Sequence, residues 1–320
     1  MSVVPKSIQE RVDALVKRHD TLSDPGAGVF FARELEQIYL EVIEHRLPLL
    51  NAMKYFPIDR SVNEGANTYT HYIVQKIGEA DFIANPADDL PRVDIAKKKQ
   101  TFNIENIGAS YGYTIFEIAA AQMANMSLDR LRGNAVKRAI EEKLNNVFWY
   151  GDTALSLYGI LSYPWIPRYV FTNPIISATA ADTIIAELNN YVNSISELTN
   201  GVESPDTLLM PTAPYNHIAS TPRSATSDTT ILEFFIRNNP YIKEVHPVAE
   251  LTQAGPSSVH QLVAFRSGDM NVGKLVCPID FRQLAPQERN LEFIVNAIAR
   301  CGGFASMYPL AMCIGDVPLA

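Results

Sequence analysis

The chain has 320 residues, of which 47% are hydrophobic and 19% charged, and its formal net charge is −8. This composition excludes a wholly disordered chain and allows one large domain or two. The negative charge argues against a protein dedicated to binding nucleic acid, because contacts with phosphate need a basic surface. The three cysteines, Cys277, Cys301 and Cys313, are widely spaced and predict buried thiols, not a disulfide framework or a zinc site.

The first segment of the chain is polar. Residues 1–28 contain a short amphipathic pattern that is too brief to be stable as a helix in water, so we expect an arm that lies on another surface. Residues 29–47 predict a helix that ends at Pro48. No apolar run near the start is long enough for a signal peptide, and none elsewhere predicts a membrane span.

Two strands are predicted between residues 61 and 113. Residues 68–77 and 101–107 are rich in β-branched and aromatic side chains, and a polar excursion that ends in Lys97, Lys98 and Lys99 separates them. They can pair as an extended hairpin, which is marginal in water unless it rests on another surface. That surface is either the chain's own core or a neighbouring subunit. The three lysines either meet an acidic patch on that neighbour or form a solvated turn.

A long amphipathic helix is predicted over residues 127–150, after a shorter helix over residues 115–126. Ser127 is a suitable N-cap, and Gly151 stands where a helix commonly ends in a left-handed residue. The helix would be about 34 Å long. Gly133 lowers its stability by about 1 kcal/mol relative to alanine, unless a neighbour packs closely there.

The rest of the chain predicts a mixture of helices and short strands. Residues 157–174 are apolar but interrupted by prolines, and they predict short strands and turns. Residues 181–198 predict a second amphipathic helix. Further apolar runs predict two short helices, residues 211–220 and 230–237, and six strands, residues 206–210, 241–245, 260–265, 274–279, 291–299 and 304–314. We expect the last three strands to return to the main core.

This order of elements resembles a known family. Its sharpest local match is residues 148–161, which contain the aromatic-Gly-Asp turn of residues 148–152 and the Gly-Ile-Leu segment of residues 159–161, and the D-x-L-L-M-P strand of residues 206–211 follows in the same order. Together they resemble the major capsid proteins of tailed bacteriophages, whose Hong Kong 97-type α+β fold is shared with encapsulin shells. The resemblance implies an N-terminal arm (1–28), an N-terminal helix and connection (29–60), an E-loop (61–113), a peripheral domain (114–205) with its spine helix (127–150), an axial domain (206–275) and return strands to the peripheral domain (276–320).

The function that this resemblance implies is structural. The chain would assemble with copies of itself, as hexamers and pentamers, into the icosahedral head shell around a double-stranded DNA genome. The implied location is the virion, with assembly in the host cytoplasm, and portal, scaffolding or decoration proteins are possible partners. No catalytic, cofactor-binding or metal site is expected. An encapsulin-type nanocompartment shell is the alternative within the same fold.

The remote alternative is a serine hydrolase. Residues 108–112 match G-x-S-x-G with Ser110 as nucleophile, and His217, His246 or His260 could act as its base. The preceding strand is polar, however, and two closely spaced glycines that flex a hairpin hinge explain the motif more simply. Glu141 and Glu142 are interpreted as a solvated or intersubunit face of the long helix, with a metal-binding pair as the less favoured reading.

Overall fold

The computed structural model describes residues 48–78, 94–124, 128–224, 226 and 228–319. The predicted arm of residues 1–28 and the predicted helix of residues 29–47 lie outside this range. Among the described residues, no helix has both the length and the apolar character that crossing a membrane requires.

The predicted long helix is confirmed as α4, Leu128–Tyr150, and the shorter one before it as α3, Ile115–Ala124. Gly151 ends α4 with a φ of +76°, and its N–H donates to the carbonyl of Val147 at 2.8 Å. Gly159 packs against this turn so closely that a Cβ there would lie 2.6 Å from the Trp149 carbonyl oxygen. Both glycines are therefore required by the sharp change of direction after the helix.

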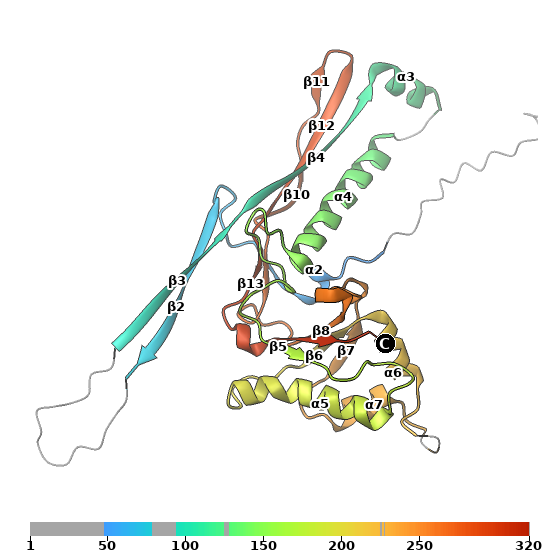
Figure 1. The fold of residues 1–320 in the computed structure, drawn as a ribbon. Helices are drawn as coiled ribbons and strands as arrows, with labels where there is room; N and C mark the ends of the chain where they lie inside the picture. Colours follow the sequence, from blue (N-terminus) through green and yellow to red (C-terminus); the bar gives the residue numbers. More distant parts are fainter. Residues whose placement is uncertain (1–47, 79–93, 125–127, 225, 227, 320) are drawn as a thin grey trace, which may run out of the picture. The chain divides into compact units, whose positions relative to one another are not determined.

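A long sheet lies against α4 (Figure 1). It contains β4 (Glu105–Thr114), β10 (Ile279–Gln283), β11 (Gln287–Arg289) and β12 (Glu292–Cys301). Strand β12 is central and pairs antiparallel with β4 over ten residues, from Glu105 opposite Cys301 to Thr114 opposite Glu292. A Cβ at Gly133 of α4 would lie an ordinary 3.6 Å from the Tyr111 hydroxyl of β4. No very close approach of the backbone therefore requires this glycine.

The predicted hairpin exists as a two-stranded ribbon of β2 (Thr68–Ile77) and β3 (Asp94–Asn103). The first strand has the predicted limits. The second was predicted at 101–107 and is wrong in its limits, because the chain turns at Ile104. The N–H of Ile104 donates to the Asn67 carbonyl at 2.8 Å and its side chain is buried. From Glu105 the chain joins β12 instead, and the three lysines lie within β3, not in a turn.

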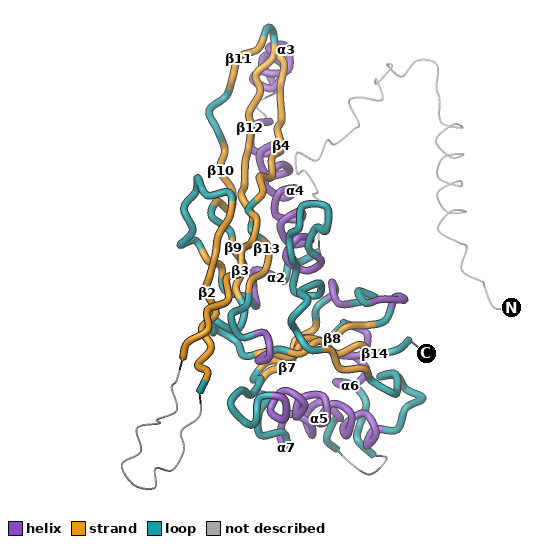
Figure 2. The backbone as a smooth tube through the Cα atoms, turned by 60° about the vertical axis from the view of Figure 1, so that its left-hand side comes forward, coloured by secondary structure: helices purple, strands orange, loops and turns teal. Residues whose placement is uncertain are grey.

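A second, five-stranded sheet has the order β5–β14–β8–β6–β7. Its strands are β5 (Arg168–Val170), β6 (Thr207–Met210), β7 (Glu244–Pro247), β8 (His260–Phe265) and β14 (Cys313–Val317). The helices α5 (Ala181–Leu198), α6 (Thr212–Ser220) and α7 (Ile231–Asn238) accompany this sheet, and Figure 2 shows α5 and α7 along one side of it.

This sheet separates two hydrophobic cores. Leu208 and Met210 of β6 pack in the core that contains α5, whereas Leu209 between them packs in the core that contains α4. Strand β8 alternates in the same way, with Leu262 on the α5 side and Val263 on the α4 side. Because successive side chains point to opposite faces of a strand, both faces are buried and the strands have continuous apolar sequences.

The smaller elements complete the core around α4. Strand β9 (Lys274–Val276) lies between β1 (Ile58–Asp59) and β13 (Gly303–Ala305). The short helix α2 (Ala52–Tyr55) precedes Phe56, whose ring stacks on Phe265 with centroids 4.5 Å apart. Three 3-10 turns span Ala249–Leu251, Pro256–Ser258 and Pro309–Ala311.

Two groupings of elements differ from expectation. The resemblance implies that helix α5 belongs with the long helix, within residues 114–205, but its apolar face packs against the five-stranded sheet. Of the strands expected to return to the core of the long helix, β12 and β13 do so, with Ala297, Ala299 and Phe304 in that core. Strand β14 instead pairs with β8 and β5 in the five-stranded sheet. The predicted strand of residues 304–314 is also interrupted, because Pro309 begins a 3-10 turn. Strand β7 starts three residues later than predicted.

Candidate assembly surfaces

The structure does not form a nucleophile elbow at Ser110. Ser110 lies in the middle of β4, directly opposite Asn296 of β12, in an antiparallel pair. An elbow needs a sharp turn between a strand and a helix, so the hydrolase interpretation is wrong. The interpretation of Gly108 and Gly112 as a hairpin hinge is also wrong, because both lie within the paired strand.

The three histidines considered as its base have local partners instead. His217 Nδ1 is 3.1 Å from Thr221 Oγ1, and His246 Nε2 is 2.9 Å from a Glu244 carboxylate oxygen. His260 Nδ1 accepts a hydrogen bond from the Gln253 N–H at 3.3 Å. Within the described part of the chain, no three His, Cys, Asp or Glu side chains gather as a metal-ligand group.

The exposed face of α4 carries ion pairs. Glu141 lies 3.8 Å from Lys137, and Glu142 lies 2.7 Å from Arg138, each one helical turn away. Such pairs stabilise an exposed helix by only a few tenths of a kcal/mol. The two glutamates thus interact with cations of their own helix, and the structure gives no support for a metal-binding pair there.

The ribbon has one face packed on the body and one face exposed. On the packed face, the rings of Tyr69 and His71 stack on Phe102 with centroids 5.0 and 5.3 Å away. Phe102 is buried against Tyr163 of the body. Burial and, to a smaller extent, the nearby Lys274 lower the pKa of His71, although its hydrogen bond to Gln100 acts in the opposite direction.

The exposed face of the ribbon carries apolar side chains. Tyr72 is 63% exposed and Ile95 is 55% exposed, and Lys97 and Lys99 lie on the same face. A two-stranded ribbon is marginal by itself, and its stability here comes from the packed end. Its outer face is therefore an apolar and basic surface that the described residues leave uncovered.

Several hydrogen bonds fix the root of the ribbon to the body. Arg300 is buried and donates to the Glu64 carbonyl and, at 3.0 Å, to Asn67 Oδ1. Arg282 forms a bidentate pair with the Glu64 carboxylate at 2.6 and 2.9 Å. The ribbon thus leaves the body at a position set by two arginines of the long sheet.

A second exposed apolar surface lies where β4, β12 and α3 meet. It consists of Ile115, Phe116, Met123 and Leu291, and Phe116 and Met123 are 73% and 93% exposed. The N–H of Ile115 donates to the Leu291 carbonyl at 3.1 Å, which joins the helix to the turn between β11 and β12. Arg132 of α4 pairs with Glu117 at 3.0 Å and fixes α3 in place. We call these four residues the tip surface.

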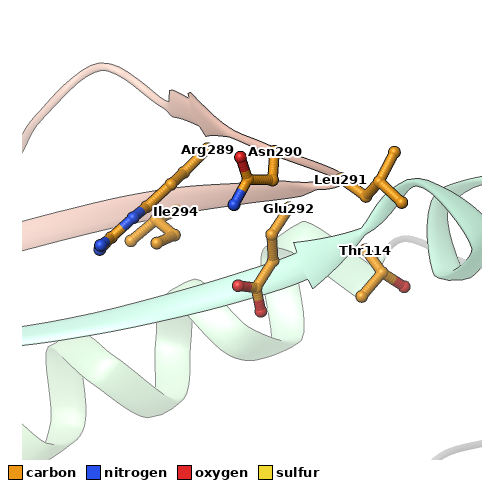
Figure 3. A pocket seen from close by; sticks show the side chains of 6 residues that line it. All are labelled: Thr114, Arg289, Asn290, Leu291, Glu292 and Ile294. Atoms are coloured by element: carbon orange, nitrogen blue, oxygen red, sulfur yellow. The ribbon is translucent and has the colours of Figure 1, made fainter.

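Beside the tip surface is an open hollow of about 460 Å³, shown in Figure 3. Its lining combines the end of β4 with the β11–β12 turn: Thr114, Arg289, Asn290, Leu291, Glu292 and Ile294. Sequence reasoning predicted the helix over residues 115–126 but not the exposure of its apolar residues. The only available signal was a helix that is apolar almost all round, which is unusual for an exposed helix.

Exposed apolar projections on a well-packed body are typical of a subunit that assembles with other molecules. The family model described as "Major capsid protein" matches residues 78–317, which is 240 of the 320 residues. The chain therefore belongs to the major capsid protein family. It is a capsid shell protein, and this part of the predicted function is confirmed. In sequence, no curated protein matches the chain.

Solved structures support the fold. The capsid of Myoviridae phage XM1 is similar with a TM-score of 0.79 at 14% identity, covering 91% of this chain and 100% of that chain. The structure from Mycobacterium phage Bobi matches with a TM-score of 0.62 at 15% identity, covering 90% of this chain and 97% of that chain. A virus-like particle from Pyrococcus furiosus matches with a TM-score of 0.50 at 13% identity, covering 82% of this chain and 91% of that chain. The predicted Hong Kong 97-type α+β fold is confirmed.

Proposed function

We propose that this chain is the major capsid protein of a tailed bacteriophage and that its copies form the icosahedral head shell around double-stranded DNA. The observation that carries the proposal is the exposed apolar face of the ribbon, with Tyr72 and Ile95, on a chain that belongs to the capsid family. An exposed ribbon of this kind gains stability when a neighbouring copy covers it. Hexamers and pentamers are the rings in which such contacts repeat.

The remaining roles follow from this proposal. The E-loop expected over residues 61–113 is proposed here as residues 61–103, because residues 105–114 pair with β12. The part around α4 acts as the peripheral domain. The axial domain expected over residues 206–275 is proposed as the five-stranded sheet together with α5, because α5 packs against that sheet. The subunit acts by assembly, without a catalytic step or a cofactor. Its location is the virion, after assembly in the host cytoplasm. Portal, scaffolding or decoration proteins bind the assembled shell. The net charge of −8 limits general affinity for the enclosed DNA.

Electron microscopy of the purified full-length chain tests this proposal. We expect closed shells or capsomer rings, whereas a monodisperse monomer under all assembly conditions would overturn it. The variant Tyr72→Ser with Ile95→Ser should lower the yield of shells. Thr70→Ala is the matched control, because Thr70 lies on the same ribbon face and carries little apolar surface.

An encapsulin-type nanocompartment remains the second candidate, and the match to the Pyrococcus furiosus particle favours it. That match covers less of the chain, at a lower TM-score, than the match to the phage XM1 capsid. Particles isolated from the native source distinguish the two candidates. Nuclease-protected double-stranded DNA inside them supports the phage head, and an enzyme cargo without DNA supports the nanocompartment.

A further inference from the structure

Another hollow, of about 270 Å³, lies beside α6 at the five-stranded sheet, and we call it the α6 pocket. Figure 2 shows α6 next to β14 there. Four segments meet at the pocket, and most of the residues that they contribute are apolar: Ile175, Ile176, Ser177, Ala213, Pro214, His217, His260, Pro318 and Leu319. Its volume is just below the roughly 300–1,000 Å³ that is usual for small-molecule sites, so it suits a small ligand.

The fold brings two histidines to the α6 pocket. Ala213, Pro214 and His217 are spaced three and four residues apart in α6, so they lie on one side of this helix. His260 begins β8 and pairs with Val317 of β14, and the residues that follow Val317 continue along the pocket. His217 and His260 therefore reach the same pocket from separate elements.

The ring of His260 is held as a hydrogen-bond donor. Its Nδ1 accepts from the Gln253 N–H at 3.3 Å, so in the neutral ring the proton lies on Nε2. Burial lowers the pKa of His260, which favours this neutral form at pH 7. The Nε2–H group has no hydrogen-bond partner among the described residues. His260 thus offers a free N–H group at the pocket.

His217 and Ser177 add two more polar groups. His217 Nδ1 is 3.1 Å from Thr221 Oγ1, and because this hydroxyl can donate, the ring proton of His217 can lie on Nε2. Neither His217 Nε2 nor the Ser177 hydroxyl has a hydrogen-bond partner within the described part of the chain. A ligand that combines a hydrogen-bond acceptor with an apolar body would complement both the polar groups and the apolar wall.

The α6 pocket has no acidic lining. Its described lining residues include no Asp, Glu, Lys or Arg. The carboxylate of β14, Asp316, accepts from Gln261 at 2.7 Å and lies on the α4 side of the sheet, as Ile314 does. Asp182, at the start of α5, pairs with Arg223 at 3.2 Å. An anion in the pocket therefore meets no carboxylate of the lining, and an imidazole that gains a proton attracts it.

We propose that the α6 pocket binds an aliphatic carboxylate. The carboxylate accepts hydrogen bonds from the Nε2–H groups of His217 and His260, and the aliphatic chain lies against the apolar lining. This chemistry belongs to a short branched carboxylic acid and equally to a leucine-like residue at the C-terminal end of a peptide. The site goes beyond the proposed shell function and does not depend on it.

A divalent metal ion fits the same residues less well. The hydrogen bond from Gln253 keeps the lone pair of His260 on Nδ1 and the proton on Nε2, which is the nitrogen that would have to coordinate. Zinc that binds in place of the carboxylate, and is lost when either histidine is replaced, would mark a metal site and overturn the proposal.

Calorimetric titration of the full-length chain with 4-methylpentanoate tests the site. We expect saturable binding, and binding about fivefold or more weaker for 4-methylpentanamide, which keeps the aliphatic chain but lacks the charge. His217→Phe and His260→Phe should each weaken binding of the acid about fivefold or more. His246→Phe is the matched control, because His246 is also half-buried but does not line the pocket. Equal binding of acid and amide, or unchanged binding in both pocket variants, overturns the proposal.

Filling the pocket gives a test that leaves both imidazoles in place. Ala213 is exposed on α6, so Ala213→Phe should fold normally while its ring occupies the pocket and abolishes binding. Asn216→Phe is the matched control, since Asn216 is exposed on the same helix outside the lining. Unchanged binding in Ala213→Phe, with a melting temperature equal to that of the control, would place the ligand elsewhere and overturn the proposal.

The pH dependence reports on the contact between carboxylate and imidazole. Affinity for 4-methylpentanoate should rise several-fold as the pH falls from 8 to 6, because the bound anion favours the protonated form of each ring. An affinity that does not change over this range would overturn the contact.

A pair of peptides identifies the source of the carboxylate. If acetyl-glycyl-leucine binds more tightly than 4-methylpentanoate, and its C-terminal amide does not, the site receives a chain end. If the free acid binds more tightly, the site receives a small molecule. Either result supports the proposal, and the absence of saturable binding by both compounds overturns it.

Discussion

Lys274 Nζ lies 2.6 Å from Asp59 Oδ2, and both side chains are largely removed from solvent, with 15% and 6% of their surface exposed. Asp59 Oδ1 also accepts hydrogen bonds from the hydroxyl and the N–H of Ser61, at 2.6 and 2.8 Å. This pair links β1 to β9 in the core around α4, at the start of the connection that leads to the ribbon.

We expect Asp59→Asn to lower the free energy of unfolding by about 3 kcal/mol, because it leaves Lys274 without its counter-charge in a buried position. Chemical denaturation of the unassembled chain measures this loss. Asp182→Asn is the control, since Asp182 pairs with Arg223 at the surface and its loss should cost less than about 1 kcal/mol. Equal losses for the two variants would contradict the role assigned to Asp59.

The same pair predicts how stability depends on pH. Burial by itself raises the pKa of Asp59, but the hydrogen bonds from Lys274 and Ser61 outweigh it and lower the pKa below its ordinary value of 3.8. The stabilisation is therefore complete above about pH 4 and is lost as the pH falls through the lowered pKa. In Asp59→Asn this acid-dependent loss should be smaller than in the unchanged chain, as measured by melting temperature between pH 5 and pH 2.

Adding one methyl group in the turn after α4 should lower the free energy of unfolding strongly. Gly159→Ala would bring a Cβ to within 2.6 Å of the Trp149 carbonyl oxygen, so the backbone must move. Gly201→Ala is the control, because Gly201 has a φ of +78° but no atom within 4 Å of a Cβ. Its cost should be about 1–2 kcal/mol from the left-handed backbone alone. Gly159→Ala should lower the free energy of unfolding by clearly more than Gly201→Ala does. A loss no larger than that of the control would contradict the close packing of this turn.

The tip surface predicts a defect in assembly without a defect in folding. Phe116→Ser with Leu291→Ser should lower the yield of shells while changing the free energy of unfolding by less than about 1 kcal/mol, because both side chains are exposed. Val202→Ser is the matched control, since Val202 is 76% exposed in the turn after α5. Shell yields equal to those of the control would show that the tip surface is not a contact.

The three cysteines should be unreactive in the folded chain. Burial raises the pKa of Cys301 to about 12 and of Cys313 to about 11, and it also raises the pKa of Cys277. Since the thiolate is the reactive form, a thiol reagent at pH 8 should label none of them until the chain unfolds. Denaturant should then expose all three, and rapid labelling of a native thiol would contradict the burial of that cysteine.

Sequence patterns predicted the elements whose signal is local. The limits of α4, α5, β2 and β8 follow from apolar spacing and from residues such as Gly151 that end a helix. The buried thiols were also predicted correctly, and all three are free and buried. These features depend on neighbours within a few residues, which a sequence displays directly.

Long-range pairing could not be predicted in this way. Nothing near Glu105 indicates that β4 leaves the ribbon and pairs with β12, almost 200 residues later. The apolar face of α5 fits any apolar sheet equally well, so its place beside β6 and β8 depends on the whole fold. The tip surface was missed for a related reason, because an exposed phenylalanine and a buried one look alike in a sequence.

The single sheet shared by the two cores limits how the subunit can bend. Leu208 and Leu209 are neighbours in β6, yet each belongs to a different core. A relative rotation of the two cores would therefore break the hydrogen bonds between β6 and its partner strands. The shared strand thus opposes rotation of one core against the other. In the shell proposed above, the ribbon and the far end of the long sheet would have to absorb the differences in curvature between pentamers and hexamers.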